Sequence, residues 1–205
     1  SYLKANNNVG ALAGQLQGKS VFENCSSNID VTGKKFFAGG IIGLAAGDQT
    51  FTNCHTTGDI TITQGREGRA HDHFRVGGIA GGWSDNVKTP LVVTNCSYTG
   101  KVSGKDFNGN EANPLDYAGY VGRGYTLANA GTTVNIDGIR YVQKYDGADK
   151  AGVYDVTDAE GNTLVFDAEG LSTIIKAGGK AKLANDITIT SKWDERYTGR
   201  STEPV

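Results

Sequence analysis

The stretch Ala38-Gly-Gly-Ile-Ile-Gly43, followed by Asn53-Cys-His-Thr-Thr-Gly-Asp-Ile-Thr-Ile62, decides the fold because copies of both blocks recur along the chain. The first stretch, here the glycine block, recurs without gaps at 9–14, 76–81 and 118–123. The second, the asparagine block, recurs at 24–33, 95–104 and 129–138. Self-similarity at a period of about 20–50 residues is typical of a stacked repeat, whose single units cannot bury their own apolar face.

Apolar residues occupy three fixed positions in every repeat. Short apolar segments separated by turns, with no helical stripe, predict strands. Three such segments per repeat fit one triangular coil, so the predicted fold is all-β: a parallel β-helix (β-solenoid) of about four coils. The three columns contain Phe22, Phe51, Val93 and Leu127 before the Asn, Val31, Ile60, Val102 and Ile136 after it, and Leu12, Ile41, Ile79 and Val121 in the glycine block.

The asparagine that opens each second block is predicted to form a sharp corner. Asn tolerates the left-handed backbone conformation, and its amide can bond to the same amide one coil away. Because Phe22 and Asn24 share one face of a strand, we expect this ladder to point inward and to turn the next residue inward too. That next residue is Cys25, Cys54 or Cys96, and Ala130 in the last copy, which predicts buried free thiols rather than a disulfide or a zinc site.

The stretches 39–43 and 51–61, and the parallel stretch from Val76 to Gly104, resemble GLUG-type repeats. These occur in large bacterial secreted and surface proteins, including adhesin-like proteins and non-catalytic regions of IgA-specific proteases. The resemblance covers about Val9 to Gly138 and implies an extracellular or cell-surface β-solenoid without catalytic residues. The first and fourth copies depart from the pattern, as copies that cap a stack often do.

The pattern divides the chain into three predicted regions. Residues 1–138 form the solenoid repeats, and 139–170 a β-hairpin connector or cap with turns at Asp146-Gly147, Glu160-Gly161 and Glu169-Gly170. Residues 171–205 start a further solenoid-like segment plus a polar tail, with a short helix at 171–176 that ends at Gly178-Gly179.

Composition excludes several classes of function. The net charge of −2 gives no electrostatic footprint for nucleic acid. No apolar run is long enough to span a bilayer, so membrane insertion within this segment is not expected. The chain lacks Met and begins at Ser1, so we expect an excerpt of a longer polypeptide whose further domains lie outside it.

Two consecutive repeats carry longer loops at the same corner. From the Asn to the next glycine block the chain takes 14 residues after Asn24, but 23 after Asn53 and 23 after Asn95 by this alignment. Insertions on one face of a repeat array often form its binding face. Aromatic, Asn, Asp and Arg side chains suit carbohydrate or peptide recognition. The candidate ligand-binding residues of these paired loops are Arg66, Arg69, His71, Asp72, His73 and Phe74 in the first, and Asp106, Phe107, Asn108, Asn110 and Glu111 in the second.

Three other patterns are weaker. His71-Asp72-His73 could hold a metal, but a His-x-His in a polar loop is usually solvated, so neither metal nor cofactor is expected. Asp30 and Asp59 share an outward column, as a glycosidase carboxylate pair would, yet Lys101 and Asn135 follow them there. The stretch 14–20 has three residues between its glycines where a phosphate-binding loop needs four, which indicates a repeated corner.

The predicted function is therefore non-catalytic: an adhesin stalk or recognition surface for a host or microbial glycan or surface protein. The alternatives are a β-helix polysaccharide lyase or hydrolase, and a pure structural spacer. A catalytic domain could still lie outside the segment.

Overall fold

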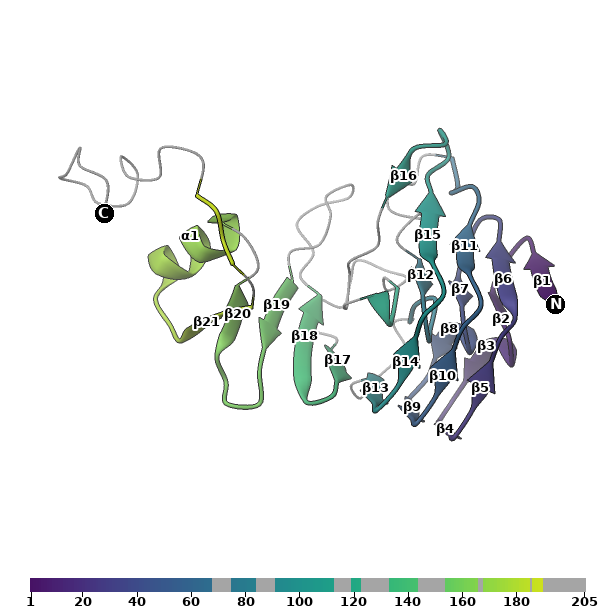
Figure 1. Ribbon diagram of the computed structural model, residues 1–205, viewed down its shortest axis with the longest axis horizontal. Coiled ribbons are helices and arrows are strands. Elements are labelled where there is room, and N and C mark those ends of the chain that lie inside the picture. The colour runs from purple at the N-terminus through teal and green to yellow at the C-terminus, as the bar shows by residue number, and fades with distance from the viewer. Residues whose placement is uncertain are drawn as a thin grey trace. The chain divides into compact units, whose positions relative to one another are not determined.

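The computed structural model describes residues 1–67, 75–83, 91–112, 119–122, 133–143, 154–165, 168–184 and 186–189. The chain divides into two compact units. Unit 1 comprises Ser1–Asp137 and Tyr141–Tyr154, and unit 2 comprises Gly138–Arg140 and Asp155–Val205. Most of the described secondary structure is strand (Figure 1).

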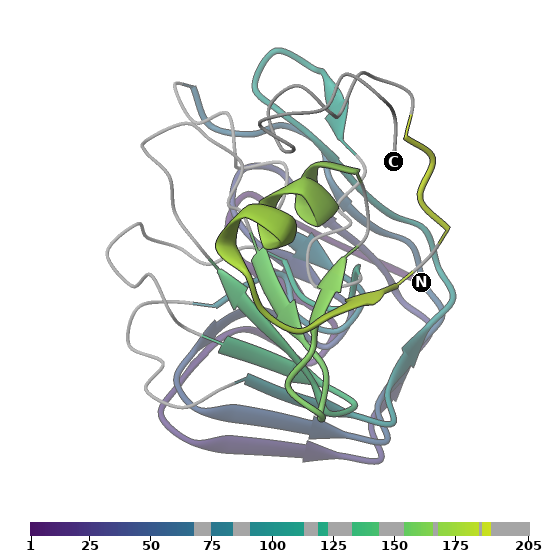
Figure 2. The ribbon, with the colours of Figure 1, turned by 90° about the vertical axis from the view of Figure 1, so that its left-hand side faces the viewer.

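Unit 1 is built from strands that recur in the same order and pair in parallel with their counterparts in the next repeat (Figure 2). Four sets span three or more repeats: β1 (Tyr2–Ala5), β6 (Asp30–Gly33), β11 (Ile60–Ile62) and β15 (Val102–Lys105); β2 (Val9–Gly10), β7 (Ala38–Gly39) and β12 (Val76–Gly77); β4 (Ser20–Glu23), β9 (Gln49–Thr52), β13 (Leu91–Thr94) and β17 (Thr133–Ile136); β5 (Ser26–Ser27), β10 (His55–Thr56) and β14 (Ser97–Tyr98). A fifth set pairs β3 (Ala13–Gln17) with β8 (Ile42–Ala46). The strand β16 (Glu111–Ala112) pairs antiparallel with β15.

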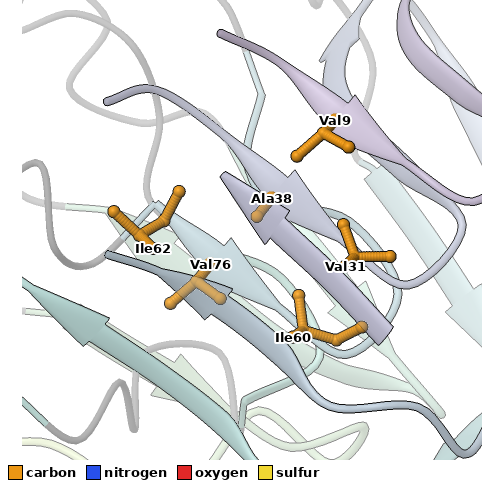
Figure 3. Close-up of a cluster of buried hydrophobic side chains, with 6 residues drawn as sticks. All are labelled: Val9, Val31, Ala38, Ile60, Ile62 and Val76. Carbon is orange, nitrogen blue, oxygen red and sulfur yellow. The ribbon is translucent and has the colours of Figure 1, made fainter. Parts of the chain in front are cut away.

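The core of unit 1 follows the predicted columns, except that in the glycine block Ile41 and Ile79 are buried but Leu12 is 54% exposed. Val31 pairs with Ile60, and Ile60 pairs with Val102, so the column seven residues after the Asn is confirmed for the first three repeats. Strand alternation sends these side chains inward, where they meet the side chains of β2, β7 and β12. Figure 3 shows the resulting cluster, which contains Val9, Val31, Ala38, Ile60, Ile62 and Val76.

The asparagine corners form as predicted in conformation but not in direction. Asn24, Asn53 and Asn95 have φ of 54°, 53° and 49°, in the left-handed region. Their amides form a ladder in which Asn53 Nδ2 donates to Asn24 Oδ1 (3.2 Å) and Asn95 Nδ2 donates to Asn53 Oδ1 (2.6 Å). The prediction that the ladder points inward was wrong: Asn24 and Asn95 are exposed and Asn53 is half-buried. The left-handed residue breaks the strand alternation, so the amide leaves the face that Phe22 occupies.

The glycine block of the fourth repeat is displaced by one residue from its predicted alignment. Val121 bridges Ala80, which bridges Ile42, and Val121 therefore does not continue the column of Ile41 and Ile79. The cause is steric. A Cβ on Gly81 would lie 2.6 Å from the backbone N of Ala38, and a Cβ on Gly122 would lie 2.0 Å from Gly81 O. Only glycine fits this close approach, and Gly122, not Arg123, supplies it.

The predicted alignment of the asparagine block in the fourth repeat is also wrong. Ile136 pairs with Val93 in the Phe22–Phe51 column, not with Val102, and Asn135 pairs with Val92, not with Lys101. The predicted column residue Leu127 and the predicted corner residues Asn129 and Ala130 lie outside the described residues.

Among its described residues, unit 2 contains a β-hairpin, one helix and one further short strand. The strand β19 (Tyr154–Thr157), which belongs to unit 2 from Asp155 on, and β20 (Thr163–Val165) form an antiparallel hairpin around Gly161 (φ 79°), as predicted for Glu160-Gly161. The strand β21 (Ala181–Leu183) pairs parallel with β20. The helix α1 (Ala168–Ala177) confirms the predicted helix, but it begins earlier and includes Glu169-Gly170, so the turn predicted there was wrong. It ends as predicted at Gly178, whose φ of 72° and hydrogen bond to Ile174 O cap the last turn.

Two further features complete the described chain. The strand β18 (Ile139–Gln143) contains residues of both units. No helix among the described residues has the length and apolar character needed to cross a membrane. The turn predicted at Asp146-Gly147 and the tail from 190 onward lie outside the described residues.

Candidate functional site

The two long loops leave unit 1 from neighbouring strands at the same edge. Ile62, the last residue of β11, pairs with Gly104 of β15, so the loops start side by side (Figure 1). The backbone of the first loop continues the ladder for two residues, because Thr63 N bonds to Gly33 O (2.9 Å) and Gln64 N bonds to Lys34 O (3.0 Å). The first loop is therefore hydrogen-bonded at its start to the preceding repeat, and it starts beside the second loop.

The first loop is fixed at both ends by arginine–aromatic contacts with the preceding repeat. The guanidinium of Arg66 lies 4.6 Å from the centre of the Phe36 ring, and that of Arg75 lies 5.0 Å from the centre of the Phe37 ring. Arg75 is only 1% exposed, and a cation held over an aromatic face is worth more when it is desolvated. Arg66, one of the predicted site residues, therefore packs against Phe36 and holds the start of the loop. Between these anchors, the predicted site residues Arg69, His71, Asp72, His73 and Phe74 lie outside the described residues.

The second loop begins as a tight hairpin between β15 and β16. Lys105 pairs with Glu111 across the hairpin, and their side chains form a salt bridge of 3.3 Å. Asp106 closes the turn: its carboxylate accepts bonds from Asn110 N and Asn110 Nδ2, both at 2.8 Å. Gly109, with φ of 86°, supplies the left-handed position that such a turn requires.

The hairpin sorts the predicted site residues into two groups. Asp106, Asn110 and Glu111 hold the turn together, whereas Phe107 and Asn108 lie at its tip. Phe107 is 41% exposed and Asn108 is exposed, so an aromatic ring and an amide are presented on a rigid support. Sequence reasoning named these residues but missed the turn, although an Asp three residues before a Gly is a signal for it.

The outward carboxylates of unit 1 serve the backbone. Asp30 Oδ1 accepts a bond from Asp59 N (2.9 Å), and Asp59 Oδ1 accepts one from Lys101 N (2.8 Å). Each carboxylate therefore caps an amide of the next repeat. Beside them, Thr61 Oγ1 and Ser103 Oγ lie 3.1 Å apart on the same outward face. The arrangement accounts for both aspartates without an acid–base role.

The cysteines form a column directly after the asparagine corner. Cys54 and Cys96 are buried, Cys25 is half-buried, and all three are free thiols. Burial raises the pKa of the Cys54 thiol to about 11 and also raises the pKa of Cys96, because a buried thiolate loses its hydration. The prediction of buried thiols is confirmed for Cys54 and Cys96 but not for Cys25. A more exposed pair lies beside them, with His55 Nδ1 2.8 Å from Ser97 Oγ.

The described part of the chain contains no cluster of three or more His, Cys, Asp and Glu side chains that could hold a metal ion. His71 and His73 lie outside the described residues. The stretch 14–20 is strand and corner, and Gly18 turns the chain with φ of 75°, as the repeated-corner interpretation predicts.

Comparison with known families gives one match. A family model described as the GLUG motif matches residues 5–32, which contain β2 to β5 and most of β6. The match falls on the first repeat. No curated protein and no solved structure matches the chain.

Proposed function

We propose that this chain is a β-solenoid segment of a large extracellular or surface protein of bacteria, and that it acts as an adhesin stalk or recognition surface. The in-register parallel pairing of three successive repeats supports a solenoid. The GLUG motif at residues 5–32 is consistent with a region of an extracellular GLUG-repeat protein. Long parallel ladders make a stiff support on which loops can change without disturbing the core.

The site that we propose for recognition is the pair of loops after Ile62 and Gly104. The observation that carries this assignment is that the two insertions start from paired residues, Ile62 and Gly104. Glycan or protein surfaces suit this site, because Phe107 offers a stacking face and Asn108 offers hydrogen bonds. The residues between Arg66 and Arg75 add His, Asp and Phe side chains by sequence.

A catalytic alternative, a β-helix polysaccharide lyase or hydrolase, has weaker support. It requires carboxylates available to a substrate, whereas Asp30 and Asp59 accept backbone bonds from the next repeat. A pure spacer remains the simpler alternative, because Arg66, Asp106 and Glu111 are engaged within the protein.

The test is binding of this chain to an array of host and microbial glycans and matrix proteins. The decisive variant is the double substitution Phe107→Ala and Asn108→Ala, which leaves Asp106, Gly109 and Asn110 to form the turn. We expect at least about a tenfold loss of affinity, since a buried aromatic contact and one hydrogen bond together contribute more than about 1.4 kcal/mol.

The matched control is Thr61→Ala together with Ser103→Ala, which alters the outward face of the sheet but neither loop. Equal affinity of the tip variant and the wild type would exclude the hairpin tip. If shortening 64–74 then left affinity unchanged as well, the paired loops would be excluded for that ligand. Release of sugar from any polymer on the array would favour the catalytic alternative.

A further inference from the structure

The three cysteines are neighbours in one in-register column. His55 pairs with Ser26 on one side and with Ser97 on the other, which places Cys54 between Cys25 and Cys96. Adjacent strands lie about 4.8 Å apart, and a disulfide joins Cα atoms about 4.4–6.8 Å apart. Backbone spacing therefore permits a bond from Cys54 to either neighbour, but not from Cys25 to Cys96.

The thiols have one common orientation. Each Sγ lies within hydrogen-bonding distance of the carbonyl two residues earlier: Glu23 O for Cys25 (3.5 Å), Thr52 O for Cys54 (3.4 Å) and Thr94 O for Cys96 (3.4 Å). Each later sulfur also leans toward the preceding repeat. Cys96 Sγ accepts a bond from Cys54 N (3.3 Å), and Cys54 Sγ reaches Phe22 O (3.5 Å) in the first repeat.

The two possible pairs differ in access. Cys54 and Cys96 are buried, so neither thiol meets a dissolved oxidant easily. Cys25 is half-buried, and it directly precedes β5, which lies at the end of the three-stranded order β14-β10-β5 among the described strands. Its side chain can therefore meet an oxidant and can turn toward Cys54, as disulfide geometry requires.

We propose that Cys25 and Cys54 form a disulfide bond when the protein meets an oxidised thiol couple such as glutathione disulfide, and that this bond ties the first repeat to the second. The Cys25 thiolate attacks one sulfur of glutathione disulfide, forms a mixed disulfide and expels one glutathione thiolate. The Cys54 thiolate then attacks the Cys25 sulfur and expels the second. Two electrons and two protons leave the protein, and two molecules of glutathione are produced.

The consequence of this bond is an inter-repeat crosslink with one thiol left over. Cys96 remains reduced at the far side of Cys54. The crosslink closes the chain from Cys25 to Cys54 and restrains the unfolded state.

The test treats the reduced, folded chain with glutathione disulfide and then blocks the remaining thiols with an alkylating reagent. Trypsin places the three cysteines on separate peptides, 20–34, 36–66 and 89–101, so mass spectrometry reads the pairing directly. We expect titratable thiols to fall from three to one, with peptides 20–34 and 36–66 joined and peptide 89–101 alkylated. A rise in Tm of a few degrees should accompany the bond.

Two variants make the result specific. Cys96→Ser should still form the bond, whereas Cys25→Ser should keep both of its thiols reduced over the same time. The proposal is overturned if all three thiols persist, if Cys25 stops at the glutathione adduct, or if Cys54 pairs with Cys96. A disulfide-linked dimer of two chains would overturn it as well.

Discussion

The aromatic column of unit 1 offers a direct test of the stacking. The rings of Phe22 and Phe51 are parallel within 6° with centroids 4.9 Å apart. Phe51 lies in the second repeat and is fully buried, whereas Phe22 lies in the first and is half-buried. Both substitutions to Ala remove the same ring contact, so any difference between them reports how far each site is enclosed.

The expected magnitudes follow from burial. Phe51→Ala should lower the free energy of unfolding by about 3–5 kcal/mol, since a buried Phe leaves a cavity that neighbours cannot fill. Phe22→Ala should cost about half of that, because part of its ring is already in water. Phe51→Leu keeps most of the side-chain volume, so the change in packing should cost less than about 1.5 kcal/mol. Loss of the contact between the two rings should add about 0.5–1.5 kcal/mol.

The assay is urea unfolding followed by the fluorescence of Trp83, which is fully buried in unit 1. A Trp193→Phe background makes Trp83 the only tryptophan, because the chain has two. Equal losses for Phe22→Ala and Phe51→Ala would refute the reasoning, since it would show that the first repeat is as enclosed as the second. A changed m-value would show instead that the stack no longer unfolds as one unit.

Three further results are expected. Asn53→Gly should lose the two side-chain amide hydrogen bonds but keep the left-handed corner. Asn53→Ala should lose the hydrogen bonds and also strain the corner, so it should be the less stable variant. A lower urea midpoint for Asn53→Gly than for Asn53→Ala would contradict this. The pKa of Asp158 is lowered to about 2, chiefly by hydrogen bonds from Asn162, so its contribution to stability should be present above about pH 4 and disappear as pH falls toward 2. Acid titration of the wild type against Asp158→Asn measures this, and parallel curves would disprove it. Iodoacetamide should alkylate Cys25 well before Cys54 in the folded chain, because burial shields Cys54 from the reagent and raises its pKa to about 11; mass spectrometry of the tryptic peptides gives the order, and simultaneous labelling would be inconsistent with the burial of Cys54.

Much of unit 1 could be predicted because its repeats obey simple rules. Val31, Ile60 and Val102 are apolar at one fixed distance from an Asn, and strand alternation then leaves them no other direction than inward. The corners could be predicted because Asn is one of few residues that tolerate φ near +50°.

The fourth repeat could not be predicted because a gapless alignment ignores what each position must accommodate. The alignment placed Arg123 at a position where a Cβ would meet the backbone of the adjacent repeat, so Gly122 takes that place. Tyr120, moved by the same shift, packs edge-on against Tyr98 with ring centroids 5.0 Å apart. The packing of large side chains and the close approach of backbones depend on tertiary structure, which a sequence alignment does not show.

The candidate site was only partly predictable. Unequal spacing located both loops, since length alone shows that extra residues must leave the stack. Spacing could not show that Asp106 and Asn110 bond to each other, or that Arg66 lies over Phe36. Polar and charged residues in a loop look alike in sequence whether they bind a partner or hold the loop.

The hydrogen bonds of the asparagine ladder all point the same way along the stack, so the ladder has a net dipole. Every step sends an N–H from the later repeat toward the carbonyl of the earlier one, so the small amide dipoles add instead of cancelling. Like a helix, the row has a partially positive end, at Asn24, and a partially negative end, at Asn95. An anion near the first repeat and a cation near the third would each be stabilised, so the stack is polar along its axis even where its surface carries no net charge.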